Sequence, residues 1–323
     1  MNRQQIIDRF MANGIIPVIA GCDSEQTISH VMDALVKGGL PLLEITFRMD
    51  HAETYIRTIR REFPDVLVGA GTVLSVEQAD LAIEAGALFI VTPGLNHQVV
   101  QHCNESGIPV FPGVATASEI EQALELGCDV VKFFPAEQLG GVKTIKALSG
   151  PYKRVKFIPT GGVGFDEMND YLAAQPVLAI GGTFMFQNLI QKQDWPGITS
   201  LTKKAVQMML DLRLEKLLLN TSDKETTWQT AQTMSEAFQL DMNQPQEDAL
   251  TMGSFLQLQA GPASQEAGQL ILSTPNLMRT MVYLTSRGVS FVESADDAGL
   301  KQLSQAIECT GRISGYSIKI VQR

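Results

Sequence analysis

The sequence predicts an α/β protein, a (β/α)8 TIM barrel followed by a smaller C-terminal α+β domain. Eight short apolar runs alternate with helix-like segments over about 190 residues, as in a parallel sheet whose strands are buried on both faces. Their number and spacing fit a compact (β/α)8 barrel, with an open doubly wound sheet as the alternative. The segment 223–323 is rich in Gln, Ser and Thr, and this change in composition indicates a second domain.

The apolar runs are the expected strands, and the segments between them are the expected helices. The strands are expected at 15–20, 42–47, 66–71, 88–94, 108–113, 129–134, 155–162 and 177–182. Helices are expected over 24–39, 75–87 and 116–128, among others, with Ser24, Ser75 and Ser118 as N-caps and glycines after the last turns.

The tail of the chain, 214–323, contains a weak internal repeat. The segment 217–240 resembles the segment 270–291, 53 residues further on, and each has the pattern of a strand, a polar turn and a helix. Two such copies predict a duplicated domain of the βαβββ type. It is expected to be separate from the barrel domain, 1–213.

Composition and charge exclude several classes of function. The chain has 35 acidic and 25 basic residues, a net charge of −10, which disfavours nucleic acid or an anionic membrane as a partner. Four cysteines without a paired spacing indicate reduced thiols. The N-terminus has no apolar signal core, and no apolar run is long enough to span a bilayer. We therefore expect a cytoplasmic protein without a membrane span.

A lysine lies in the middle of the apolar run "DVVKFF" (129–134). Side chains alternate across a strand, so Lys132 shares one face with Val130 and Phe134. Because the face toward the helices must be apolar, Lys132 is expected to point into the barrel, near the strand end where barrel active sites form. Burial disfavours the charged form of an amine, and the neutral amine is the nucleophilic form.

The same alternation in "LLEITFR" (42–48) places Glu44, Thr46 and Arg48 on one face. Glu44 is the expected partner of Lys132. A purely structural salt bridge is the alternative, although a buried ion pair gains little over apolar packing. Arg48, at the exit of the strand, offers a planar guanidinium fork to a carboxylate or a phosphate.

Two pairs of glycines end the last two expected strands, in "PTGGV" (159–163) and "IGGTF" (180–184). Glycines let backbone N–H groups approach an anion closely, and phosphate sites in such barrels form after strands 7 and 8. Thr72, in "GAGTV" (69–73), either donates to substrate or caps the next helix. The expected anion site comprises Thr160, Gly161, Gly162, Gly181, Gly182 and Thr183.

No pattern in the sequence indicates a cofactor or a metal. The four histidines, His30, His51, His97 and His102, lack a metal-ligand spacing such as HxH or HExxH, which argues against a zinc-dependent reaction. A GxSxG elbow and a Walker GK[ST] sequence are also missing from the chain. We expect neither a bound metal nor a cofactor.

Six motifs together resemble the 2-keto-3-deoxy-6-phosphogluconate (KDPG) / 4-hydroxy-2-oxoglutarate (KHG) aldolase family. They are "LEITFR", "GAGTV", "VTPG", "VKFFPAE", "PTGGV" and "IGGTF", and the similarity covers about residues 1–210. The resemblance implies a class I aldolase with a homotrimeric (β/α)8 barrel. It implies that Lys132 is the Schiff-base lysine and Glu44 the acid/base residue.

The resemblance also implies where the substrate lies. Arg48 and Thr72 would hold the pyruvate carboxylate, and Pro93 and Phe134 would line the pocket. Gly161, Gly162, Gly182 and Thr183 would bind the phosphate. Relatives often have Ser and Trp where this chain has Thr183 and Phe184, and threonine keeps the hydroxyl donor.

These implications lead to one reaction and several alternatives. The expected reaction cleaves KDPG, a phosphorylated 2-keto-3-deoxy sugar acid, to pyruvate and glyceraldehyde 3-phosphate, and KHG to pyruvate and glyoxylate. One alternative substrate is the 6-phosphogalactonate epimer. A non-catalytic phosphosugar-binding barrel is the alternative of another class, and the inward-pointing lysine argues against it.

The tail resembles, more weakly, a divergent vicinal-oxygen-chelate (glyoxalase-like) module. The resemblance rests on 268–293 and on the final strand "GYSIKIVQ" (315–322). Such modules hold their metal with His, Glu or Gln side chains, and no histidine follows His102 in this chain. We therefore expect a glyoxalase-like domain without a metal, which serves packing or assembly.

Overall fold

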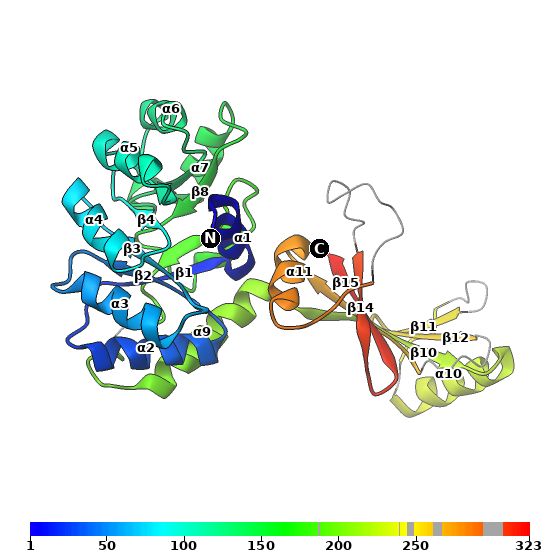
Figure 1. Cartoon of the computed structure of the whole chain (residues 1–323). Helices are drawn as coiled ribbons and strands as arrows, with labels where there is room; N and C mark the ends of the chain where they lie inside the picture. The colour runs from blue at the N-terminus through cyan, green and yellow to red at the C-terminus, as the bar shows by residue number, and fades with distance from the viewer. Residues whose placement is uncertain (187, 239, 244–248, 261–266, 293–305) are drawn as a thin grey trace. The chain divides into compact units, whose positions relative to one another are not determined.

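The computed structural model describes residues 1–186, 188–238, 240–243, 249–260, 267–292 and 306–323 (Figure 1). Gln239 and Glu293, which fall in the tail segments singled out above, lie outside these residues. The chain divides into two compact units, Met1–Met209 and Leu210–Arg323. The border falls a few residues before 213, because helix α9 runs to Leu210 and the next strand begins at Arg213.

The first unit is a barrel of parallel strands. Its strand segments are β1 (Ile15–Ile19), β2 (Leu42–Thr46), β3 (Leu67–Gly71), β4 (Ile90–Val91), β5 (Val110–Phe111), β6 (Gly113–Val114), β7 (Val130–Phe133), β8 (Lys156–Pro159) and β9 (Ile180–Gly182). Segments β5 and β6 lie on either side of Pro112 and together form the fifth barrel strand. All eight expected strands are therefore present.

Pairing runs continuously around the barrel. One sheet has the order β5-β4-β3-β2-β1-β9 and the other the order β6-β7-β8, with every pair parallel. The bridges Phe157↔Val177 and Thr160↔Gly181 join the two sheets at β8 and β9. The (β/α)8 fold predicted from the alternating apolar runs is confirmed, and the doubly wound alternative is wrong.

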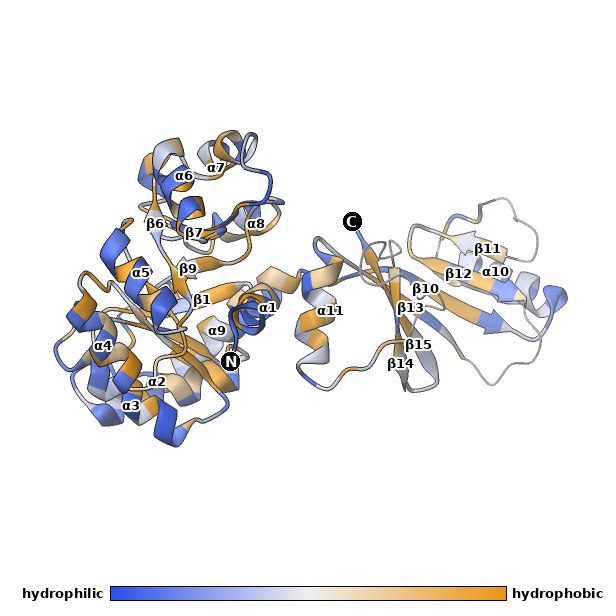
Figure 2. Cartoon of the chain, turned by 45° about the horizontal axis from the view of Figure 1, so that its top comes forward, coloured by the Kyte–Doolittle hydropathy of each residue, from blue (hydrophilic) through white to orange (hydrophobic). Residues whose placement is uncertain are grey.

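The helices of this unit pack around the strands, most of them on the outside with their hydrophilic sides outward (Figures 1 and 2). They are α1 (Arg3–Asn13), α2 (Glu25–Gly38), α3 (Ala52–Glu62), α4 (Val76–Glu84), α5 (His97–Glu105), α6 (Ala117–Glu125), the 3₁₀ turn η1 (Glu137–Leu139), α7 (Gly141–Ser149), α8 (Met168–Leu172) and α9 (Trp195–Leu210). Among the helices of the described residues, none is long and apolar enough to cross a membrane. The four cysteines form no disulfide.

The helix starts test the predicted N-caps. Ser24 accepts the backbone N–H of Thr27, and Ser75 accepts that of Gln78, as predicted. Ser118 as an N-cap is wrong. Thr116 caps α6 instead, because Glu119 reaches back to the Thr116 N–H and completes a capping box.

Helix α1 closes the barrel at the amino-terminal ends of the strands. Its Phe10 meets Phe89 edge-on, with 4.9 Å between ring centroids. This interior cluster also contains residues near the starts of the strands, such as Leu42, Leu67 and Val130. Val130 therefore points into the barrel, and so does Lys132, two residues further along the same strand. With the amino-terminal end filled by this cluster, space for a ligand remains at the carboxyl end of the barrel.

The second unit is built on one six-stranded sheet. Its elements are β10 (Arg213–Thr221), α10 (Lys224–Phe238), β11 (Ala249–Met252), β12 (Leu256–Ala260), β13 (Gly268–Thr274), α11 (Leu277–Thr285), β14 (Ala306–Ile313) and β15 (Tyr316–Gln322). The strand order is β11-β12-β10-β13-β15-β14.

The two halves of this sheet repeat one plan. In each half the first strand pairs in parallel with the last, which pairs antiparallel with the strand before it. An isolated bridge, Met242↔Met252 or Phe291↔Cys309, takes the place of the remaining strand of a βαβββ unit. Each half also has its own small apolar core, under α10 or α11. The duplicated α+β fold predicted from the repeat is confirmed.

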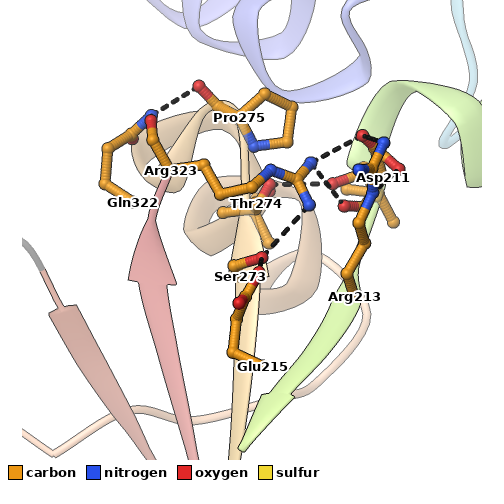
Figure 3. Close-up of polar contacts among 10 residues, drawn as sticks. Asp211, Arg213, Glu215, Ser273, Thr274, Pro275, Gln322 and Arg323 are labelled. Carbon is orange, nitrogen blue, oxygen red and sulfur yellow. Dashed lines mark hydrogen bonds and ion pairs between the residues drawn. The ribbon is translucent and has the colours of Figure 1, made fainter. Parts of the chain in front are cut away.

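Polar contacts tie the start of β10 to the ends of β13 and β15 (Figure 3). Asp211 accepts hydrogen bonds from Arg213 at 2.9 and 3.0 Å and pairs with Arg323 at 2.5 Å. Arg323 also donates to Ser273 Oγ at 3.1 Å and to the Asp211 carbonyl oxygen at 2.9 Å. We refer to Asp211, Arg213, Ser273 and Arg323 as the Asp211 clasp.

Candidate active site

A cavity of about 400 Å³ lies at the carboxyl end of the barrel. It brings together all twelve residues selected from the sequence: Glu44, Arg48, Thr72, Pro93, Lys132, Phe134, Thr160, Gly161, Gly162, Gly181, Gly182 and Thr183. Three further residues line it, Val18, Thr46 and Val163. Thr46 could have been found from the sequence, because it alternates with Glu44 and Arg48 on one face of its strand.

Lys132 and Glu44 form the floor of the cavity. Lys132 is 5% exposed and Glu44 3% exposed, and Lys132 Nζ lies 3.8 Å from Glu44 Oε1. This distance is within ion-pair range but too long for a hydrogen bond. Lys132 Nζ also lies 5.1 Å from the centre of the Phe134 ring. The amine and the carboxylate therefore face each other across a space that a reacting atom can enter.

Glycines on neighbouring strands make this arrangement possible. A Cβ atom at Gly71 would lie 2.0 Å from Glu44 Oε1, so the Glu44 side chain occupies the space above Gly71. Gly113 is the register partner of Lys132, and a Cβ atom there would lie 2.2 Å from the Pro93 carbonyl oxygen. Side chains at these two positions would displace the base or the strand beside the lysine.

Burial and charge act in opposite directions on Glu44. Desolvation raises the pKa of its carboxyl above the ordinary value of 4.5, while Lys132 and then Arg48 oppose the rise. A carboxyl with a raised pKa holds a proton more readily than an ordinary glutamate and can still release it, as an acid/base group must. Glu44 therefore has the chemistry of a general acid and base.

The opposite side of the cavity consists mainly of the two glycine turns. Gly161 and Gly162 have φ of +96° and +81°, in the left-handed region that favours glycine. Gly181 leaves room for Thr160, whose hydroxyl would lie 2.3 Å from a Cβ atom at position 181. Thr183 is exposed at the rim. Backbone in such turns can bring its N–H groups close to an anion.

Arg48 and Thr72 lie at the rim on the other side. Arg48 is exposed two residues beyond the end of β2, and Thr72 directly follows β3 with φ of +55°. Of the two roles left open for Thr72, helix capping is wrong, because Ser75 caps α4. Thr72 lines the cavity instead.

Within the part of the chain that the structure describes, no group of three or more His, Cys, Asp or Glu side chains could hold a metal ion. Among the described residues that line the cavity, Glu44, Arg48 and Lys132 are the titratable or charged ones.

A buried lysine–glutamate pair at the carboxyl end of a (β/α)8 barrel, in a cavity bordered by two glycine turns, is an arrangement suited to Schiff-base chemistry. Comparison with known proteins agrees with this class. The family model of KDPG and KHG aldolase matches residues 6–201, and the chain belongs to this family.

Similar proteins show the same relationship. The chain is 46% identical over 207 residues to a 2-dehydro-3-deoxy-phosphogluconate aldolase of Haemophilus influenzae, covering 64% of this chain and 97% of that one. A KDPG aldolase of Legionella pneumophila, solved with pyruvate captured as a covalent carbinolamine intermediate, has a TM-score of 0.59 and 36% identity. The matched region covers 61% of this chain and 95% of the Legionella chain.

A KDPG aldolase of Zymomonas mobilis, solved with 3-phosphoglycerate, also has a TM-score of 0.59 and 36% identity, covering 62% of this chain and 94% of its own.

Proposed function

We propose that the chain cleaves KDPG to pyruvate and glyceraldehyde 3-phosphate through a Schiff base on Lys132. The observation that supports this most is the buried Lys132 amine, 3.8 Å from the Glu44 carboxylate, in a cavity bordered by two glycine turns. The covalent pyruvate adduct of the Legionella relative supports the same chemistry.

The reaction follows from the positions of the two groups. The neutral Lys132 amine attacks the C2 ketone, and loss of water leaves an iminium. Glu44, through a water molecule, takes the proton of the C4 hydroxyl, and the C3–C4 electron pair moves into the iminium. The aldehyde leaves and an enamine remains. Glu44 returns the proton to C3, and water hydrolyses the iminium to release pyruvate and free Lys132.

The rim residues hold the two ends of the substrate. Arg48 and Thr72 bind the C1 carboxylate, since a guanidinium and a hydroxyl are both donors to an anion. Pro93 and Phe134 pack against the carbon chain. The C6 phosphate lies against Thr160, Gly161, Gly162, Gly181, Gly182 and Thr183. The 3-phosphoglycerate of the Zymomonas structure is a three-carbon phosphorylated acid, which agrees with an anion site of this kind.

KHG is the second candidate substrate, and the family description favours it because it names both activities. KHG shares the 2-keto and 4-hydroxy groups with KDPG and lacks the phosphate. The test is a panel of KDPG, its galactonate epimer and KHG, with pyruvate release measured for each. We expect KDPG to have the highest kcat/KM, and absence of pyruvate release from all three would overturn the proposal.

The assembly and the tail are further parts of the proposal. The barrel is a homotrimer, which sedimentation equilibrium of the full chain tests directly. The second unit is a glyoxalase-like module without a metal, supported by its duplicated βαβββ plan. Elemental analysis of the purified full chain should find no stoichiometric divalent metal, and one bound Zn²⁺ or Ni²⁺ per chain would contradict this.

A further inference from the structure

Thr46 is the most buried polar residue on the floor of the cavity. It is 1% exposed and lies two residues after Glu44 on the same face of β2. Its backbone pairs with Gly71 of β3. No role for its hydroxyl follows from the reaction described above.

Two side-chain atoms in the described part of the chain are buried and have no hydrogen-bond partner within the protein. They are Glu44 Oε1 and Thr46 Oγ1, and both residues line the same cavity. A buried hydroxyl or carboxylate oxygen without a partner is costly, so nearly all such atoms in proteins are paired with protein or water. Two neighbouring exceptions at a catalytic floor therefore indicate a shared partner.

The backbone brings these two atoms toward each other. Residues i and i+2 of a strand are about 6.6 Å apart at Cα. The Glu44 side chain leans along the strand over Gly71, the register partner of Thr46, which shortens the separation of the two oxygens. One water molecule joins oxygens up to about 5.5 Å apart, because each O–H···O contact is about 2.7–2.8 Å.

We propose that Thr46 is a positioning residue for Glu44, and that its hydroxyl holds the water molecule through which Glu44 exchanges protons with the substrate. This inference rests on the proposed function. In cleavage the water gives a proton to Glu44 Oε1 as it takes the proton of the C4 hydroxyl. In enamine protonation the same transfer runs in reverse and delivers the proton to C3.

Thr46 lies between Glu44 and Arg48 along the strand. This order determines which part of the substrate the Thr46 hydroxyl faces. With the carboxylate at Arg48 and the iminium at Lys132, the Thr46 hydroxyl faces the pyruvate half, which KDPG and KHG share. The effect of Thr46 is therefore expected to be the same for both substrates. It differs in this respect from a phosphate ligand.

The test compares Thr46→Val, which keeps the shape and removes the hydroxyl, with Thr46→Ser, which keeps the hydroxyl. The readout is exchange of the pyruvate methyl protons in D₂O, followed by ¹H NMR, because this half-reaction needs only Lys132 and the proton relay. We expect Thr46→Val to slow exchange and cleavage roughly 10–100-fold, since misplacement of a catalytic group by about 1 Å costs up to 10². Thr46→Ser should retain most of the rate, and Thr46→Ala should match Thr46→Val.

A second readout separates positioning from a structural role. A hydrogen bond to a carboxylate favours its charged form, so the acid limb of the exchange rate should move to higher pH in Thr46→Val. Two charged groups face Glu44, namely Lys132 and Arg48, and both are unchanged in all variants. The KM for pyruvate should change less than about twofold.

The outcomes distinguish this inference from the proposed function. Borohydride reduction with pyruvate should still label Lys132 in Thr46→Val. If Thr46→Val is labelled and keeps the exchange rate and pH profile of the parent, the proposed role of Thr46 is overturned and the proposed function is not. A parent chain that forms no adduct on Lys132 would overturn the proposed function and this inference together.

Discussion

The barrel cavity and the Asp211 clasp both contain charged pairs, but the two are arranged in opposite ways. In the cavity, Lys132 and Glu44 are almost completely buried and lie 3.8 Å apart, and Glu44 Oε1 has no hydrogen-bond partner among the described residues. In the clasp, Asp211 accepts from two arginines at 2.5–3.0 Å, and Arg323 makes further hydrogen bonds to Ser273 and to backbone.

This difference separates a site for chemistry from a structural contact. A buried pair that is held apart costs folding free energy, since neither ion recovers its lost hydration in full. Its free lone pairs and donors remain available to a ligand. A pair with all its hydrogen bonds made has nothing left to offer a substrate. We therefore assign catalysis to the barrel and packing to the clasp.

The largest effect on turnover is expected from Glu44→Gln. Glutamine keeps the volume of the side chain but cannot accept a proton, and one positioned acid/base group is typically worth about 10²–10⁴-fold in rate. Turnover of KDPG should fall by that range, measured by coupled assay of pyruvate. Circular dichroism should match that of the parent, and an unchanged kcat would remove Glu44 from the acid/base role.

A smaller and selective effect is expected from Thr183→Val. Loss of one charge-assisted hydrogen bond to phosphate costs about 1.5–3 kcal/mol, or roughly 10–150-fold in kcat/KM for KDPG. KHG has no phosphate and should be affected little. Thr72→Val is the matched control, because a carboxylate ligand should weaken both substrates equally. Equal losses for both substrates in Thr183→Val would place the phosphate elsewhere.

The acid limb of the pH profile provides a third test. Only the ionised Glu44 carboxylate accepts a proton, and burial raises its pKa above the ordinary 4.5. Activity should therefore be lost, as the pH falls, at a higher pH than an ordinary glutamate would give. The measurement is kcat/KM for KHG against pH, where no phosphate titrates. An acid limb at or below 4.5 would contradict the burial of the base.

The smallest effect on catalysis is expected in the clasp. Asp211→Asn removes the charge that joins Arg213 and Arg323. Because Arg213 is largely exposed, the loss of stability should come mainly from the Arg323 pair and be at most about 1 kcal/mol. Scanning calorimetry of the full chain measures this loss, and kcat for KDPG should stay within about twofold. Asp33→Asn, which breaks the exposed Lys37–Asp33 pair, is the control and should change neither quantity. A fall in kcat as large as that of Glu44→Gln would contradict the assignment of catalysis to the barrel cavity and of a structural role to the clasp.

Much of the barrel site was predictable because its residues obey strand alternation. Lys132 lies in one apolar run, and Glu44 and Arg48 lie at alternating positions of another. Because the strand face that packs against the helices must be apolar, these side chains were expected to face the lumen of the barrel. The glycine pairs at the ends of β8 and β9 could be identified directly in the sequence. The role of Thr46 could not be predicted, because threonine is common in strands. What distinguishes Thr46 is a buried hydroxyl with no hydrogen-bond partner in the described part of the chain.

The clasp could not be predicted from the sequence. Asp211 and Arg323 are 112 residues apart, and their contact depends on two registers, the antiparallel one of β10 with β13 and the parallel one of β13 with β15. The N-cap of α6 is a different case, since "TASE" (116–119) already contained the capping-box pattern. The Ser118 assignment was wrong because it considered the hydroxyl alone and not the glutamate three residues after Thr116.

The most direct test of the central claim is covalent trapping on the buried lysine. The full chain is incubated with pyruvate and sodium borohydride, and the labelled peptide is mapped by mass spectrometry. We predict one reduced pyruvyl group per chain, on Lys132, and none in Lys132→Arg, which keeps the positive charge beside Glu44 but cannot form the imine. A label on another lysine, or no label on the parent chain, would contradict catalysis by the Lys132–Glu44 pair.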